Sequence, residues 1–176
     1  MTEWSPKIQP IDGDIHKEFL RNAYLHASTD SQDLVTKNAV IIVSKDYEII
    51  AYGANHFPSG VNPTEEQIKD REWKYKHIIH SEQAAIFSAA KQGKSTYDTV
   101  MYEPWVPCTP CAKAVIDAGV KKMIGHKELI MQTPERWWTD TDYALGLLEK
   151  AGVEMCMYSG KIGGVENLFN GLIWQP

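Results

Sequence analysis

The sequence predicts one α/β domain of three layers, in which helices cover both faces of a mixed five-stranded sheet. Three observations carry this expectation. Apolar residues alternate along the chain between helical and strand spacing. A helical pattern over 134–151 separates the last two strand patterns, 120–125 and 153–158, and a helix in that place makes a right-handed crossover between parallel strands. The length of 176 residues suits a single domain, residues 1–176.

Each element is predicted from the spacing of its apolar residues and from the breaking residues on either side. In chain order we expect a helix over 15–27, strands over 38–44 and 47–52, a helix over 80–92, a strand over 99–103, a helix over 107–118, and then the strand, crossover helix and strand already named. The first two strands form a hairpin that turns at Lys45-Asp46. Residues from about 61 to 79 form a charged, partly helical insertion.

Composition excludes several classes of protein. With 43% hydrophobic and 23% charged residues, the chain is neither disordered nor fibrous. Apolar runs such as Ala39 to Val43 are far shorter than the ~20 residues of a membrane span, and Met1 to Trp4 begins no signal peptide. We therefore expect a soluble, cytoplasmic protein with no membrane partner. The net charge of -5 disfavours nucleic-acid binding and favours a small substrate.

Three side chains with zinc-binding chemistry stand at the starts of two predicted helices. His80 begins one helix, and Cys108 and Cys111 lie in the first turn of another, where backbone N–H groups and the helix dipole favour thiolate. A catalytic zinc ion takes three protein ligands of this kind and leaves its fourth position for water. Glu82 is the nearby carboxylate that can collect a proton from such a water and deliver it to a substrate nitrogen.

Other interpretations of these residues are weaker. A Cys-x-x-Cys pair alone also suits a structural metal or a redox site. A structural zinc would need a fourth ligand, for which Cys156 and His77 are candidates, but Cys156 alternates with apolar residues in a strand and is expected in the core. A thioredoxin-like site has no need of His80 and Glu82. The combination therefore favours one catalytic Zn²⁺ per chain.

The sequence resembles the cytidine and deoxycytidylate deaminase superfamily at both zinc motifs. Residues 80–86, HSEQAAI, are similar to the family's His-Ala-Glu motif, and residues 107–119, PCTPCAKAVIDAG, are similar to its second motif. The deoxycytidylate (dCMP) deaminases are the most similar group, because residues 53–60, GANHFPSG, resemble their Gly-Tyr-Asn-Gly-x-Pro-x-Gly loop. The resemblance implies a cytidine-deaminase-like α/β/α fold. Departures from the family pattern, which bear on substrate details, occur at Ala54, His56 and Ala84.

The resemblance also implies an activity, the hydrolysis of dCMP to dUMP and ammonia, which supplies pyrimidine nucleotide for dTTP synthesis. Glu82 would be the catalytic residue, and Asn55, Ser81 and Trp105 would bind the substrate. Taken as residues alone, Asn55 also suits a turn and Trp105 also suits the core. The insertion carries four cations that could meet a 5′-phosphate but otherwise form a solvated helical face: Lys69, Arg71, Lys74 and Lys76.

The family further implies a homo-oligomer, often a hexamer, with dCTP and dTTP as effectors and with Mg²⁺ accompanying a regulatory nucleotide. Two enzyme alternatives stay open, a deaminase of another cytosine nucleoside or nucleotide and a deaminase of a tRNA or other nucleic-acid base. The net charge weighs against the second alternative. The non-enzyme alternative is a zinc-stabilised nucleotide-binding module, which would have no need of Glu82.

Overall fold

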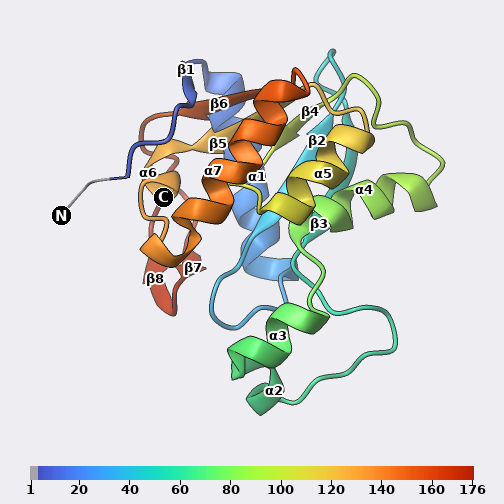
Figure 1. Cartoon of the computed structure of the whole chain (residues 1–176), viewed down its shortest axis with the longest axis vertical. Coiled ribbons are helices and arrows are strands. Elements are labelled where there is room, and N and C mark those ends of the chain that lie inside the picture. The colour runs from blue at the N-terminus through green and yellow to red at the C-terminus, as the bar shows by residue number, and fades with distance from the viewer. Residues whose placement is uncertain (1–3) are drawn as a thin grey trace.

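The computed structural model describes residues 4–176 and has one main sheet of six strands with helices on both faces (Figure 1). The strands follow the spatial order β1-β6-β5-β4-β2-β3. They are β1 (Gln9–Ile11), β2 (Ala39–Val43), β3 (Ile49–Ala54), β4 (Val100–Tyr102), β5 (Lys122–His126) and β6 (Glu154–Tyr158). Residues 1–3, which belong to the predicted domain and to the Met1 to Trp4 stretch, lie outside the described residues.

Seven helices and a small hairpin complete the described part of the chain. The helices are α1 (Asp14–Asp30), α2 (Glu65–Lys69), α3 (Arg71–His77), α4 (Ser81–Lys91), α5 (Thr109–Asp117), α6 (Lys127–Ile130) and α7 (Glu135–Lys150). The hairpin consists of β7 (Asn167–Phe169) and β8 (Leu172–Trp174), which form a separate two-stranded sheet. Every predicted helix and strand of the main domain is present, with ends within three residues of the expected ones.

The mixed sheet and its parallel crossover are confirmed. Strand β2 pairs antiparallel with β3 and β4, whereas β4, β5 and β6 run parallel to one another. Helix α7 connects β5 to β6, after the short helix α6. The crossover predicted between the last two strands of the main sheet is therefore correct.

The predicted number of strands is wrong, because the main sheet has six strands rather than five. The additional strand, β1, pairs parallel with β6 at the edge of the sheet. It is three residues long and contains Pro10, so it lacks the apolar alternation that marks a strand. Proline is tolerated at a sheet edge, where its missing N–H group costs no ladder hydrogen bond.

The β7–β8 hairpin was also not predicted, although the sequence carries a signal for it. Its turn is Asn170-Gly171, and both residues have positive φ, 51° and 78°. An Asn-Gly pair between apolar residues is a strong indicator of a two-residue hairpin turn.

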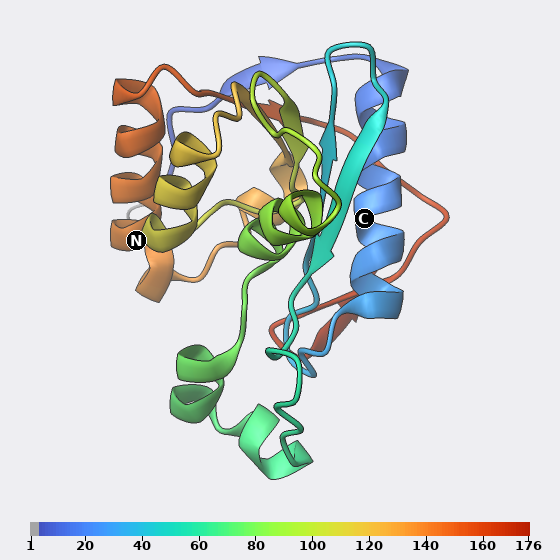
Figure 2. The ribbon, with the colours of Figure 1, turned by 90° about the vertical axis from the view of Figure 1, so that its right-hand side faces the viewer.

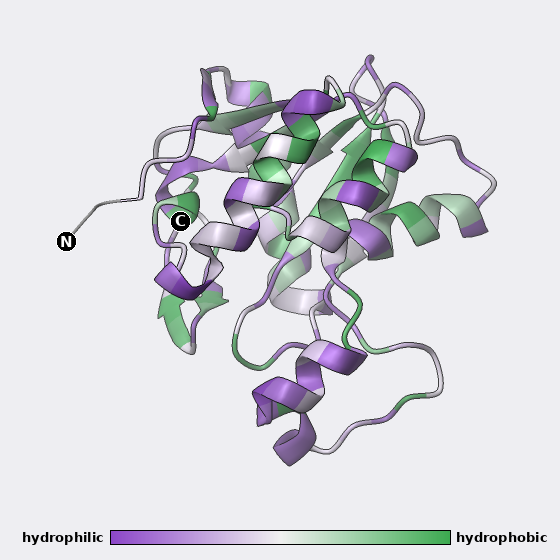
Figure 3. Cartoon of the chain, in the orientation of Figure 1, coloured by the Kyte–Doolittle hydropathy of each residue, from purple (hydrophilic) through white to green (hydrophobic). Residues whose placement is uncertain are grey.

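The two faces of the sheet pack against different helices, as Figure 2 shows. Val40 and Ile42 of β2 lie in the core shared with α4, α5 and α7, whereas Ile41 and Val43 lie in the core shared with α1. Successive side chains of a strand point to opposite faces, so the unbroken apolar run of β2 is buried on both sides. In Figure 3 this core is hydrophobic, while α2 and α3 are mostly hydrophilic and extend beyond one end of the sheet. Among residues 4–176, no helix has the length and apolar character needed to span a membrane.

Helix α4 lies directly against β3, and Gly53 sets how closely the two approach. A Cβ atom at Gly53 would meet the backbone nitrogen of Ala85 and lie 2.5 Å from the carbonyl oxygen of Ser81. These are backbone atoms that cannot rotate away. The close approach places the first turn of α4 at the end of the sheet.

We predict that Gly53→Ala destabilises the protein by about 3 kcal/mol, the upper end of the usual cost of overpacking. For a chain of this size the melting temperature should fall by roughly 6–12 °C. The matched control is Gly146→Ala within α7, where an added Cβ meets no atom within 4 Å and where alanine favours the helix. An unchanged melting temperature for Gly53→Ala would show that β3 and α4 are not tightly packed.

Candidate active site and metal centre

The three predicted zinc ligands come together where α4 and α5 begin. His80 is the N-cap residue of α4, Cys108 is the N-cap residue of α5, and Cys111 lies in the first turn of α5. The Nδ1 atom of His80 lies 3.4 Å from the Sγ of Cys108 and 3.6 Å from the Sγ of Cys111. All three donor atoms lie within 4.8 Å of one another.

These separations fit a tetrahedral zinc site. Zinc bonds of about 2.3 Å to sulfur and 2.0–2.1 Å to nitrogen place tetrahedral donors roughly 3.5 Å apart. Within residues 4–176, neither Cys156 nor His77 joins this group. Cys156 is buried in the core beside α1, as expected, and His77 stacks on Trp73 with ring centroids 3.9 Å apart. A fourth coordination position therefore remains for a small molecule, as a catalytic zinc requires.

The protonation of the donors also suits a metal. A hydrogen bond from the Cys111 thiol lowers the pKa of Cys108 to about 5, and the His80 imidazole contributes to this lowering. The same sharing of one proton raises the pKa of Cys111 above its usual range. Burial opposes a charged His80, but its contacts with Cys108 and Glu82 outweigh burial and raise its pKa to about 9. A zinc ion competes with these protons, so binding should release them.

The carboxyl group of Glu82 is buried beside the metal-binding group. Its Oε2 atom accepts a hydrogen bond from the Ser81 hydroxyl at 3.2 Å. Burial raises the pKa of Glu82, and the negative charge of Cys108 adds to the rise. A carboxyl group with a raised pKa is suited to carry a proton near neutral pH.

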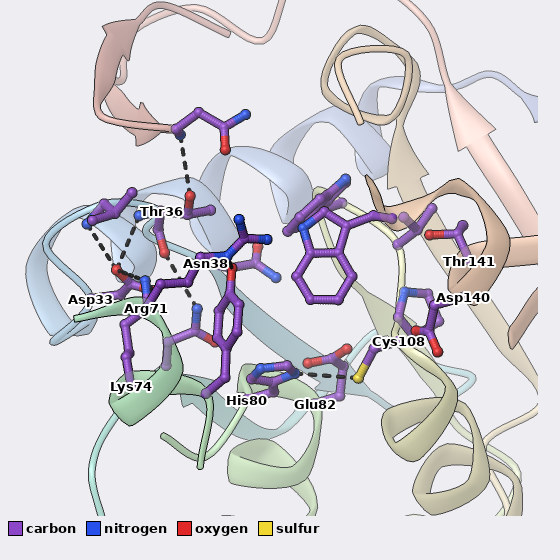
Figure 4. A pocket seen from close by; sticks show the side chains of 18 of the residues that line it. Asp33, Thr36, Asn38, Arg71, Lys74, His80, Glu82, Cys108, Asp140 and Thr141 are labelled. Atoms are coloured by element: carbon purple, nitrogen blue, oxygen red, sulfur yellow. Dashed lines mark hydrogen bonds and ion pairs between the residues drawn. The ribbon is translucent and has the colours of Figure 1, made fainter. Parts of the chain in front are cut away.

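A cavity of about 280 Å³ opens over these groups. Figure 4 shows His80, Glu82 and Cys108 on one wall, Asp33, Arg71 and Lys74 at one end and Asp140 toward the other. The predicted residues Asn55 and Trp105 also line the cavity. Of the four cations in the insertion, three line it, Lys69, Arg71 and Lys74, while Lys76 pairs with Glu72 on the exposed face of α3.

The predicted substrate-binding residues also make contacts within the protein. The Oδ1 atom of Asn55 accepts a hydrogen bond from the backbone N–H of Ser81 at 3.0 Å, which satisfies a free donor at the start of α4. The Ser81 side chain is fully buried and contacts Glu82. The indole N–H of Trp105 donates to the Thr133 hydroxyl at 2.8 Å, which fixes the ring on the cavity wall. Their roles toward a substrate stay predictions.

Several polar residues of the cavity were not predicted from the sequence. Asp33 forms a buried ion pair with Lys74, whose Nζ lies 2.9 and 2.8 Å from the two carboxylate oxygens. Asp140 of α7 accepts hydrogen bonds from the backbone and side chain of Thr109 and so caps α5. Others that line the cavity include Asn38, Glu103 and Arg136. No local motif marks these residues, because tertiary contacts alone bring them to the site.

Comparison with known proteins identifies the family. The family model described as the cytidine and deoxycytidylate deaminase zinc-binding region matches residues 14–127, which include all four residues of the zinc and Glu82 motifs. The chain belongs to the cytidine and deoxycytidylate deaminase family. The match confirms the resemblance seen in the two zinc motifs.

Named relatives agree with this assignment, and a solved structure shares the fold. A probable deoxycytidylate deaminase of Caenorhabditis elegans is 33% identical over 66% of this chain and 60% of its own length. The deoxycytidylate deaminase of Enterobacteria phage T4 is 36% identical over 48% of this chain and 39% of its own length. The chain thus spans about two fifths to three fifths of these relatives. The dCMP deaminase of cyanophage S-TIM5, solved in complex with dCMP and dUMP, shares the fold with a TM-score of 0.64 at 24% identity, covering 84% of this chain and 98% of that one.

We predict that the purified protein binds about one zinc ion per chain and that Cys108→Ala loses most of it, because two donors cannot form a stable site. Elemental analysis after dialysis measures the ratio. Cys156→Ala is the matched control, since this cysteine lies in the core away from the site and its removal should leave zinc content unchanged. Full zinc retention in Cys108→Ala would overturn the ligand assignment.

Proposed function

We propose that this chain is a zinc-dependent hydrolase that converts dCMP to dUMP and ammonia. The observation that carries the proposal is the buried Glu82 carboxyl group beside three zinc donors that leave a fourth position for water. Relatives named as deoxycytidylate deaminases support the choice of substrate. So does the cyanophage protein of the same fold, which was solved with dCMP and dUMP.

The residues of the site account for the movement of protons. When bound, zinc would supply Lewis-acid activation of a water molecule. Glu82 would accept a proton from the attacking water and deliver it to ring nitrogen N3. As the C4–N bond breaks, Glu82 would transfer the second proton of the water to the departing amino group. One water is consumed, C4 gains a carbonyl oxygen, and the nitrogen leaves as ammonia.

The charge of the cavity supports a monophosphate substrate. Lys74 is balanced by Asp33, so its charge is largely neutralised. Within residues 4–176, by contrast, Arg71 and Arg136 form no ion pair, and both line the cavity. Arg71 donates to the Tyr75 hydroxyl and Arg136 donates to Asn170, so each keeps further N–H groups for a ligand. Guanidinium groups bind phosphate in a bidentate manner.

Assembly, regulation and location are part of the same proposal. We expect a homo-oligomer, a hexamer by family resemblance, that acts in the cytoplasm and responds to dCTP and dTTP. Among the residues that the structure describes, His80, Cys108 and Cys111 form the one group of three candidate metal ligands. By the same family resemblance, Mg²⁺ would accompany the regulatory nucleotide.

We predict that Glu82→Gln keeps its zinc but that its turnover rate falls by a factor of at least ~10²–10⁴, the usual contribution of a positioned acid or base. Glutamine has a similar shape but cannot carry the proton. Ammonia release from dCMP and zinc content are measured on the same preparation. Near-normal turnover would assign the proton transfer to another group, and loss of zinc would make Glu82 structural.

We also predict that dCMP is deaminated with a kcat/KM at least about tenfold above that of deoxycytidine, since a charge-assisted contact to phosphate contributes ~1.5–3 kcal/mol. Arg71→Ala should lower kcat/KM for dCMP and leave the value for deoxycytidine almost unchanged. Lys76→Ala, outside the cavity on the same helix, is the control. Deoxycytidine as the equal or better substrate would refute the monophosphate assignment while leaving the zinc chemistry intact.

A further inference from the structure

A chain of buried hydrogen bonds leads from the sheet to the Glu82 carboxyl group. The Nδ2 atom of Asn38, which precedes β2, donates to the Ser81 hydroxyl at 3.1 Å. The Ser81 hydroxyl donates in turn to Oε2 of Glu82 at 3.2 Å. The three residues are 5%, 0% and 3% exposed, so water does not compete for these contacts. Figure 4 shows Asn38 on the cavity wall above His80 and Glu82.

The direction of each bond gives Asn38 a specific effect. A serine hydroxyl has one hydrogen, and that hydrogen rotates toward whichever acceptor is available. An amide N–H of Asn38 occupies an acceptor site of the Ser81 oxygen. The hydroxyl hydrogen is then directed at Glu82, the other partner of this oxygen. Without Asn38, nothing in this chain of contacts would fix the rotation of the Ser81 hydroxyl.

Asn38 is itself firmly held at the end of the sheet. Its backbone carbonyl accepts from the N–H of Asn55 at 3.1 Å, and its amide also donates to Oε1 of Glu103 at 3.4 Å. Asn55 in turn accepts from the backbone N–H of Ser81. Both the backbone and the hydroxyl of Ser81 are thus tied to residues that adjoin β2 and β3 of the main sheet.

The buried polar side chain of Asn38 lowers the stability of the fold, which favours a functional role for it over a structural one. Within residues 4–176, the Oδ1 of Asn38 is buried without a hydrogen-bond partner. Such an atom usually costs ~1–3 kcal/mol compared with a satisfied one. An apolar residue at position 38 would avoid this cost but would leave the buried Ser81 hydroxyl without its donor, so the polar side chain is explained by its contact with Ser81.

We propose that Asn38, acting through the hydroxyl of Ser81, is a positioning residue for the catalytic carboxyl group of Glu82. The inference rests on the proposed function, because it assigns Glu82 as the proton carrier. Asn38 orients the Ser81 hydroxyl, and this hydroxyl holds one oxygen of Glu82. With that oxygen held, the carboxyl group keeps a single orientation for its proton transfers.

The test uses Asn38→Ala and Ser81→Ala in the zinc-loaded protein. Each should lower kcat for dCMP by roughly 10- to 100-fold, as expected when a reacting group is misplaced by about 1 Å, with KM and zinc content nearly unchanged. Ser88→Ala removes a hydroxyl from the far end of the same helix, away from Glu82, and should retain the parent kcat. A parent-like kcat in Ser81→Ala would overturn the proposal.

A double variant separates positioning from a general structural effect. In Glu82→Gln, where the proton carrier is already lost, adding Ser81→Ala should lower the residual rate no further. A further loss of the same size as in the parent protein would mean that Ser81 acts independently of Glu82, which would also overturn the proposal.

Crystal structures of the zinc-loaded parent and Asn38→Ala proteins give a readout that needs no turnover. The Glu82 carboxyl group should move by about 1 Å or occupy more than one rotamer in the variant. An unmoved, single rotamer would refute the positioning role. If the parent protein deaminates no cytosine nucleotide, the proposed function fails, and the structures still decide whether Asn38 orients Glu82.

Discussion

The meeting of two helix N-termini at one end of the sheet is the constraint on which the site depends. His80 and Cys108 are far apart in sequence, yet their donor atoms lie 3.4 Å apart because α4 and α5 begin side by side. Gly53 lets α4 lie directly against β3, and Asp140 holds the first turn of α5 from α7. A change in any of these contacts would alter the spacing of the zinc donors, although none of the donor residues would itself be changed.

The same convergence concentrates negative charge in a buried place. Burial and the charge of the Cys108 thiolate raise the pKa of Glu82. Burial raises the pKa of Glu103 well above its usual range, and the charges of Glu82 and Cys108 add to this rise. Buried charge of one sign is costly unless a cation offsets it. Zinc would supply that cation, so metal binding and folding of this end of the sheet should be coupled.

The sequence was sufficient for the parts of this site that depend on local structure. The spacing of His80 and Glu82, and of Cys108 and Cys111, places each pair within one helical turn, and the alternation of elements predicts where those helices start. Strand β1 was missed because three residues with a central proline carry no pattern, whereas β7 and β8 were missed despite their Asn-Gly turn. Asn38, Asp33 and Arg136 could not be predicted, because only the folded chain brings them to the cavity.

The ion pair between Lys74 and Asp33 decides which cations of the insertion are available to a ligand in the cavity. Lys74 looks like a phosphate ligand in the sequence, but in the fold it anchors the insertion to Asp33 through a pair that is almost wholly buried. Removing one partner of such a pair usually costs 3–5 kcal/mol, roughly, because the other charge is left buried. The insertion is therefore held in place by Lys74, whereas Arg71, one turn earlier at the cavity, forms no ion pair within residues 4–176. Tyr75 meets Trp137 of α7 with ring centroids 5.5 Å apart, so this wall also contacts the helix that carries Arg136. Phosphate recognition would then depend on docking of α3 against α7, with Lys74 supplying the anchor and the two arginines supplying the charge.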